Sequence, residues 1–231
     1  MATNIKAPFF EIGPKSYLYG DEILELALAA DAASAKYGVD IIFTCPVVDI
    51  RRVKEATKHI HVFAPHMDPI PVGRGLADIL PESLVAAGAE GVMLNHVEKP
   101  VTFEVLAATI QRANEVGLTT IVCADSMADA SKIATLSPDI IVAEPSELIG
   151  TGVSVGPEYV EAAMKSVKNV NENILVLTAA GISNGTDVYN TIIAGADATG
   201  SSSGVAKAAD RAAMVDEMIA ACRKAWNERH A

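Results

Sequence analysis

Short apolar runs alternate with helix-like segments along the whole chain, and this alternation constrains the fold more than any other feature. The apolar runs are rich in Val and Ile and are bounded by turn residues, a pattern typical of buried strands. We expect strands at residues 7–13, 39–44, 61–65, 91–95, 119–124, 139–143, 173–178 and 196–201. Strands that alternate with helices predict an α/β fold with a parallel sheet.

The segments between these runs carry the start and stop signals of helices. We expect helices near residues 21–36, 46–56, 77–87, 102–116, 127–136, 157–170, 186–193 and 205–228. Four residues whose side chains can accept a hydrogen bond from a free backbone N–H are candidate N-caps: Asp21, Thr102, Ser126 and Thr186. Four glycines follow helices where a left-handed residue commonly ends them: Gly38, Gly88, Gly117 and Gly195.

Eight strand–helix pairs in 231 residues predict a single (β/α)8 barrel domain that spans residues 1–231, since such barrels typically contain about 250 residues. A chain of this length is also compatible with two small domains, and a doubly wound open sheet is the alternative architecture. No linker or low-complexity tract interrupts the eight units, which favours closure of the sheet into a barrel.

Composition excludes several classes of partner. The 29 acidic residues outnumber the 18 basic ones and give a net charge of −11, which argues against a nucleic-acid surface. A small anionic substrate stays compatible with this charge because local backbone donors can outweigh it. No apolar run is long enough to cross a bilayer, and the first residues lack the apolar core of a secretory signal. We therefore expect a cytoplasmic protein without a membrane partner.

The three cysteines, Cys45, Cys123 and Cys222, are odd in number and far apart in the sequence. This spacing suggests neither a disulfide framework nor a zinc site. We expect all three to be small buried hydrophobic residues.

In a (β/α)8 barrel the functional residues lie in the loops that follow the strands. Here those loops carry a cation, Lys15, two imidazoles, His66 and His96, and several carboxylates. Each could alone be a surface or structural residue, and their coincidence on one face favours function. The small-residue turns after the seventh and eighth strands match the usual phosphate site of such barrels. No set of residues has the spacing of a metal site, and no cofactor motif is present.

The most informative motif runs from Glu144 to Gly152. Glu144 follows the apolar run 139–143, so its carboxylate stands at the carboxyl end of a buried strand. Pro145 stiffens the segment that follows, and a Gly-Thr-Gly turn at 150–152 can expose backbone N–H groups. A carboxylate beside such a turn indicates a catalytic base next to an anion site.

Several motifs together resemble the triosephosphate isomerase family. Asn95-His-Val-Glu98 and Glu144-Pro-Ser-Glu-Leu-Ile-Gly-Thr-Gly152 are similar to the NHSE and EPPELIGTG segments of its short archaeal-type branch. The segments 66–69, 180–183 and 202–208 resemble its third loop and its two phosphate loops. The resemblance extends from Lys15 to about Asp210.

The resemblance implies a role for each matching residue. Glu144 would be the base that takes a proton from a carbon next to a carbonyl, and His96 would polarise that carbonyl through its ring N–H. Lys15 would stabilise the enediolate and the phosphate dianion, with Glu98 as its partner. The helix that follows at Thr102 would lower the pKa of His96 through its N-terminus.

The family's phosphate grip would be formed by backbone at five positions. These are Ile149, Gly150, Gly181, Ser202 and Ser203. The loop 145–151 would close over the site as a lid and exclude water.

The implied activity is a cofactor-independent aldose–ketose isomerase for a small phosphorylated sugar, most directly glyceraldehyde 3-phosphate and dihydroxyacetone phosphate. The alternatives are a four-carbon (tetrulose) ketose phosphate isomerase and, in another class, a non-catalytic barrel that binds a sugar phosphate. Other barrel enzymes with phosphate sites lack the Glu144–Gly152 motif. The family also implies a homodimer or homotetramer.

The chain departs from the family pattern at three places. Gly13 stands where the family has an asparagine that donates a hydrogen bond near the substrate carbonyl, and Gly13 suggests room for a larger sugar. Val97 replaces a serine, and Arg74–Asp78 replaces the usual tip of the third loop.

Overall fold

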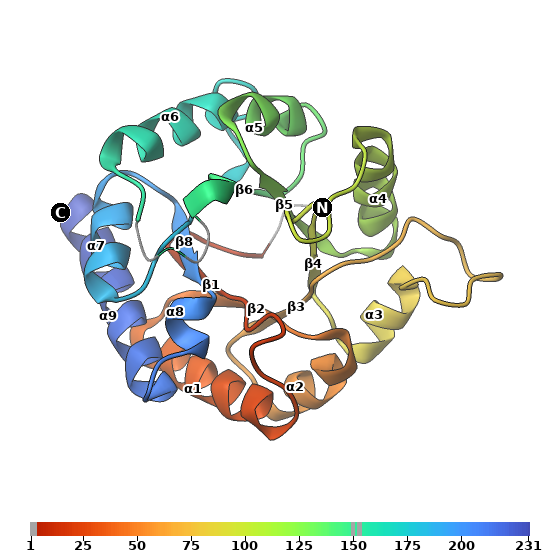
Figure 1. The fold of residues 1–231 in the computed structure, drawn as a ribbon, viewed down its shortest axis with the longest axis horizontal. Coiled ribbons are helices and arrows are strands. Elements are labelled where there is room, and N and C mark those ends of the chain that lie inside the picture. Colours follow the sequence, from red (N-terminus) through yellow and green to blue (C-terminus); the bar gives the residue numbers. More distant parts are fainter. Residues whose placement is uncertain (1–3, 149–150, 152–153) are drawn as a thin grey trace.

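A computed structural model describes residues 4–148, 151 and 154–231. Eight parallel strands pair in chain order and close into a barrel (Figure 1). They are β1 (Phe9–Ile12), β2 (Asp40–Thr44), β3 (His61–Ala64), β4 (Gly91–Leu94), β5 (Thr119–Ala124), β6 (Ile140–Ala143), β7 (Leu175–Thr178) and β8 (Ala198–Ser201). All eight lie within the expected apolar runs, and the pairing of β1 with β8 confirms the (β/α)8 barrel over the open sheet.

Helices surround the barrel on its outside (Figure 1). They are α1 (Asp21–Tyr37), α2 (Ile50–Ala56), α3 (Pro81–Ala87), α4 (Phe103–Val116), α5 (Met127–Ala134), α6 (Pro157–Lys168), α7 (Gly185–Ile193), α8 (Ser203–Ala206) and α9 (Arg211–Arg229), with single 3₁₀ turns η1 (Val47–Asp49) and η2 (Ser146–Leu148). Within the described residues, no helix combines the length and the apolar character that crossing a membrane requires.

Two of the four expected N-caps are confirmed. Thr102 accepts from the backbone N–H of Val105, and Ser126 accepts from that of Asp129. The other two predictions were wrong. Asp21 is the first residue of α1, after Gly20. Thr186 lies inside the first turn of α7. The N-cap is Asn184, two residues before Thr186, and its side chain accepts a hydrogen bond from the backbone N–H of Asp187.

Three of the expected helices begin elsewhere or divide. α2 begins at Ile50 rather than near residue 46, after the 3₁₀ turn η1. α3 begins at Pro81 rather than near residue 77, because proline suits the first helical position and restricts the residue before it. The expected helix at 205–228 is two helices, α8 and α9, and Asp210 caps the second by accepting from the N–H of Ala213.

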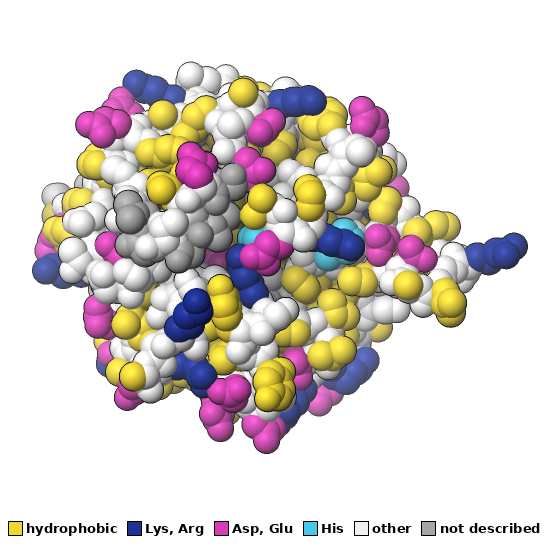
Figure 2. All heavy atoms as spheres, in the orientation of Figure 1, with side chains coloured by type: hydrophobic (Ala, Val, Ile, Leu, Met, Phe, Trp, Pro, Cys, Tyr) yellow, Lys and Arg dark blue, Asp and Glu magenta, His cyan; other side chains and the backbone are white. Residues whose placement is uncertain are grey.

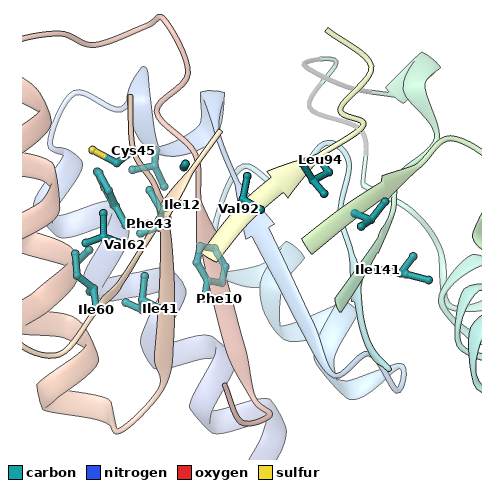
Figure 3. Close-up of a cluster of buried hydrophobic side chains, with 14 of the residues drawn as sticks. Phe10, Ile12, Ile41, Phe43, Cys45, Ile60, Val62, Val92, Leu94 and Ile141 are labelled. Carbon is teal, nitrogen blue, oxygen red and sulfur yellow. The ribbon is translucent and has the colours of Figure 1, made fainter. Parts of the chain in front are cut away.

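The core has two layers because successive strand residues point to opposite faces. Phe10 and Ile12 belong to the layer between barrel and helices, and Figure 3 shows Phe43 and Val62 of β2 and β3 in this layer. Phe9, by contrast, belongs to a separate cluster inside the barrel. That cluster also contains Ile42, Phe63, Ile121, Ile140 and Leu177. The three expected buried cysteines are buried free thiols.

Gly91 shows how tightly the barrel interior is filled. A Cβ atom at this position would overlap the ring of Phe63 and lie 2.6 Å from the carbonyl oxygen of Thr119. The glycine therefore lets Phe63 fill the interior.

The segment between β3 and α3 projects from the body as an arm (Figures 1 and 2). A backbone hydrogen bond from Asp68 to Ile79 (3.0 Å) and a return bond from the Ile79 N–H to the Asp68 carboxylate (2.7 Å) close the base of this arm. Beyond that base, Val72 and Leu76 are exposed to solvent.

Candidate active site

The carboxyl ends of the strands surround a cavity of about 800 Å³. Each described residue of the sequence prediction lines it: Gly13, Lys15, His96, Glu98, Glu144, Gly181, Ser202 and Ser203. Ile149 and Gly150 lie outside the described residues. On this face, Figure 2 shows histidine, cationic and acidic side chains close together near the middle of the barrel. The topology explains this convergence because parallel strands in a barrel all end at one rim.

Lys15 and Glu98 form an ion pair at the cavity mouth. Lys15 follows β1 with a left-handed backbone (φ 48°), and its Nζ lies 3.0 Å from Oε1 of Glu98. Partial burial alone would raise the pKa of Glu98, but the hydrogen bond and charge of Lys15 outweigh it and lower that pKa. The lysine therefore has a fixed anionic partner that reaches it from the loop after β4, as the family resemblance implied.

His96 is held as a neutral imidazole that can donate a proton from Nε2. Its Nδ1 lies 3.1 Å from the backbone N of Glu98 and accepts that N–H, which assigns the ring hydrogen to Nε2. Burial, and then the charge of Lys15, lower the pKa of His96. The N–H that holds the ring belongs to the turn after β4 and not to α4, which begins only at Phe103.

Asn95 fixes the backbone immediately before this histidine. Its φ is +56°, its Nδ2 donates to the carbonyl oxygen of Cys123 (3.0 Å), and its Oδ1 accepts from the N–H of Val101 (3.2 Å). Asparagine tolerates the left-handed conformation better than most residues. The Asn95 side chain thus connects the start of the β4–α4 loop to β5, and it also binds the end of that loop at Val101.

Glu144 is half-buried at the end of β6. Its backbone N–H donates to the carbonyl oxygen of Ala124 at 3.2 Å. Burial raises the pKa of Glu144 to about 7, while the charge of Lys15 acts in the opposite direction. A carboxylate that titrates near neutral pH is suited to accept and return a proton.

The turns after β7 and β8 pack against each other to form the end of the cavity. Ser201 Oγ donates to the carbonyl oxygen of Ile182 at 2.8 Å, and a Cβ at Gly204 would lie only 2.6 Å from that same oxygen. Helix α8 starts beside these turns at Ser203, and the first N–H groups of a helix have no partner inside it. The arrangement suits a phosphate group.

Comparison with known proteins decides the family. A family model described as triosephosphate isomerase matches residues 14–222. The chain belongs to the triosephosphate isomerase family. It is 34% identical to the triosephosphate isomerase of Sulfolobus acidocaldarius over 229 residues, which is 97% of this chain and 99% of the relative.

Two further archaeal relatives are similar to the chain over most of their length. The triosephosphate isomerase of Sulfurisphaera tokodaii is 35% identical over 97% of this chain and 100% of its own. That of Methanocaldococcus jannaschii is 37% identical over 87% of this chain and 92% of its own. The chain is thus an isomerase of the archaeal type of this family. Among its described residues, no cluster of His, Cys, Asp or Glu could hold a metal ion.

Sequence reasoning overlooked Glu11, the third residue of β1. It shares the inward face of the strand with Phe9, and it lines the cavity. Oγ1 of Thr44, on β2, donates to Glu11 Oε1 at 2.5 Å. Burial raises the pKa of Glu11 to about 7, Thr44 opposes this shift, and the charge of Glu144 adds to it. The sequence did contain one signal for Glu11, because it is the one charged residue in the otherwise apolar strand β1.

Glu11 also changes the interpretation of Gly13, where the family pattern has an asparagine. A Cβ at Gly13 would lie 2.9 Å from Oε1 of Glu11. The space that a side chain at position 13 would enter is therefore taken by the Glu11 carboxyl group. Gly13 by itself does not give a larger sugar more room.

Proposed function

We propose that the protein interconverts glyceraldehyde 3-phosphate and dihydroxyacetone phosphate through an enediolate, without a cofactor. The observation that carries this proposal is that Glu144, a neutral His96 and Lys15 line one cavity together with the turns after β7 and β8. The names of the archaeal relatives support the same substrates.

Glu144 is the proposed base. Its carboxylate removes a proton from the carbon next to the substrate carbonyl. The proton of the hydroxyl group on that carbon passes to the former carbonyl oxygen, and the carboxylic acid of Glu144 returns its proton to the former carbonyl carbon. A pKa of about 7 suits both directions, because Glu144 is then neither too weak a base nor too weak an acid near neutral pH.

His96 and Lys15 stabilise the negative charge that develops on oxygen during this transfer. The Nε2–H of His96 donates to the carbonyl oxygen, and the charge of Lys15 lies beside it. Donors that are already oriented cost no reorganisation during the reaction, and the turn N–H on Nδ1 provides that orientation here. A glutamate base with a neutral histidine is the pattern known for triosephosphate isomerase.

The phosphate group would be held by the backbone at Gly181, Ser202 and Ser203. Lys207, which lines the same end of the cavity, adds a positive charge. Ile149 and Gly150 would complete this contact from the loop 145–151, which we propose as the lid.

We further propose that residues 1–231 act as one barrel domain and that the barrel assembles as a homodimer or homotetramer. The projecting arm with exposed Val72 and Leu76 supports assembly, because exposed apolar groups on a protrusion favour burial against another surface. Light scattering of the wild type and of Leu76→Glu tests this, and an unchanged mass in the variant contradicts a role for the arm.

The decisive experiment is a panel of phosphorylated aldoses and ketoses assayed for isomerisation. We expect turnover of the triose phosphates, and Glu144→Asp should lower kcat by at least about 100-fold because withdrawal of the carboxylate by about 1 Å is costly. Glu161→Asp is the matched control, since Glu161 is exposed on α6, pairs with Lys165 and does not line the cavity.

Two other results would replace the proposal. Preferred turnover of a four-carbon ketose phosphate would support the tetrulose phosphate alternative. Binding of sugar phosphates without any turnover would support the non-catalytic barrel.

A further inference from the structure

Glu11 occupies a position inside the barrel where a carboxyl group is costly to bury. It lies two residues after Phe9, which belongs to the apolar cluster of the barrel interior. Strand residues two apart share a face, so Glu11 stands directly above this cluster, at the floor of the cavity. Charged groups in such positions are rare unless they are paired or functional.

The surrounding residues leave room for this carboxyl group. A Cβ at Gly13 would lie 2.9 Å from Oε1, and a Cβ at Gly200, on the neighbouring strand β8, would lie 3.1 Å from Oε2. The third neighbour is Thr44, whose hydroxyl donates to Oε1. Two glycines and one hydroxyl group therefore form a fitted place for Glu11.

The charged and titratable groups around Glu11 favour its neutral form when a substrate is bound. The charge of Glu144, which follows β6, raises the pKa of Glu11, and the charge of Lys15, which follows β1, lowers it. The neighbouring thiol of Cys123 on β5 is held protonated by burial. Burial raises the pKa of Glu11 to about 7 in the free protein. A bound phosphate dianion would bring further negative charge into the cavity and stabilise the protonated form.

We propose that Glu11, as a neutral carboxylic acid held by Thr44, donates a hydrogen bond to an oxygen on one of the two reacting carbons of the substrate. Oε1 already accepts from Thr44, which leaves the acid proton to Oε2. Glu11 thereby supplies, from two residues earlier in the chain, a side-chain donor that Gly13 lacks. This inference rests on the proposed function and adds a residue to its substrate contacts.

Glu11→Gln and Glu11→Leu separate donation from simple space-filling. Glutamine keeps the shape, the acceptor for Thr44 and a donor, whereas leucine keeps only the approximate size. At pH 6 we expect Glu11→Gln to stay within about tenfold of wild-type kcat/KM and Glu11→Leu to fall by about 10–100-fold, the cost of one lost hydrogen bond in a site. Affinity for inorganic phosphate should be similar in all three proteins, because its contacts lie after β7 and β8.

The pH profile gives a result that a purely structural role would not produce. In the wild type, kcat/KM should fall as Glu11 ionises on the alkaline side of the profile. In Glu11→Gln this fall should disappear, because an amide does not titrate. If Glu11→Leu does not fold, this comparison alone decides.

Three outcomes overturn the inference. If the wild type is active and Glu11→Leu has the same kcat/KM, the inference is overturned and the proposed function stays intact. The same holds if kcat/KM of Glu11→Gln still falls on the alkaline side. A wild type that isomerises no sugar phosphate overturns the proposed function and this inference together.

Discussion

Replacing Glu11 by glutamine should make the protein more stable at alkaline pH. The pKa of Glu11 is raised from 4.5 to about 7 in the folded protein. Between these values the folded state holds a proton that the unfolded state has released, so this group stabilises the fold at acidic pH. Its contribution declines as the pH rises and is lost above about 7.

The size of the effect follows from the shift. One pKa unit corresponds to about 1.4 kcal/mol, so the rise from 4.5 to about 7 corresponds to roughly 3 kcal/mol in total. Glutamine does not titrate and avoids this loss. Going from pH 5 to pH 9, Glu11→Gln should gain about 2–3 kcal/mol of unfolding free energy relative to the wild type, because part of the change already lies below pH 5.

Urea unfolding of both proteins at pH 5 and pH 9 measures this gain, and thermal unfolding should show about 2–4 °C for each kcal/mol in a chain of this size. Glu161→Gln is the control. Glu161 is paired with Lys165 on the surface, which lowers its pKa, so it is ionised at both pH values and its substitution should have the same effect at each. An equal stability difference for Glu11→Gln at pH 5 and pH 9 would refute the proposed cost of ionising Glu11.

Substitutions at three further positions test the packing of the site and of the barrel interior. Gly204→Ala should weaken binding of inorganic phosphate by at least about tenfold in calorimetry, because its Cβ would lie 2.6 Å from the Ile182 carbonyl oxygen; unchanged affinity would show that the two turns separate freely. Asn95→Ala should destabilise the fold by about 1–3 kcal/mol and lower kcat, because two side-chain hydrogen bonds are lost and alanine is strained at the left-handed φ; Asn95→Gly should recover only the part of the stability that this strain costs, and none of the kcat, so recovery of kcat would contradict a role in orienting the loop. Gly91→Ala should destabilise the protein by at least about 3 kcal/mol in urea unfolding, because its Cβ would overlap the ring of Phe63; a wild-type midpoint would contradict the tight filling of the barrel.

The sequence predicted the barrel because each strand is an apolar run and because glycine, proline and capping residues separate these runs from the helices, even where the exact first residue of a helix was misplaced. Once the strands are in order, the topology alone brings Lys15, His96 and Glu144 to one rim. The place of each of these residues could therefore be predicted without knowledge of any distance.

Glu11 could not be found in the same way. A strand in a parallel sheet is buried on both faces, so its sequence does not reveal which residues point inward. Only the closed barrel assigns Phe9 and Glu11 to the interior. The contact between the Glu98 N–H and His96 depends on a local turn, which residue types and spacing do not determine. The cap of α7 was missed for a related reason, since Asn184 and Thr186 are both able to cap and the backbone conformation selects the first.

The packed barrel interior also determines how molecules pass through the enzyme. Phe9, Phe63 and their neighbours fill the space beneath the cavity, so in the described part of the chain the barrel offers no exit at its opposite end. Substrate and product must then use the same opening, and a second substrate can enter only after the first product has left. Accumulated product should accordingly slow the forward reaction by competing with substrate for the one cavity.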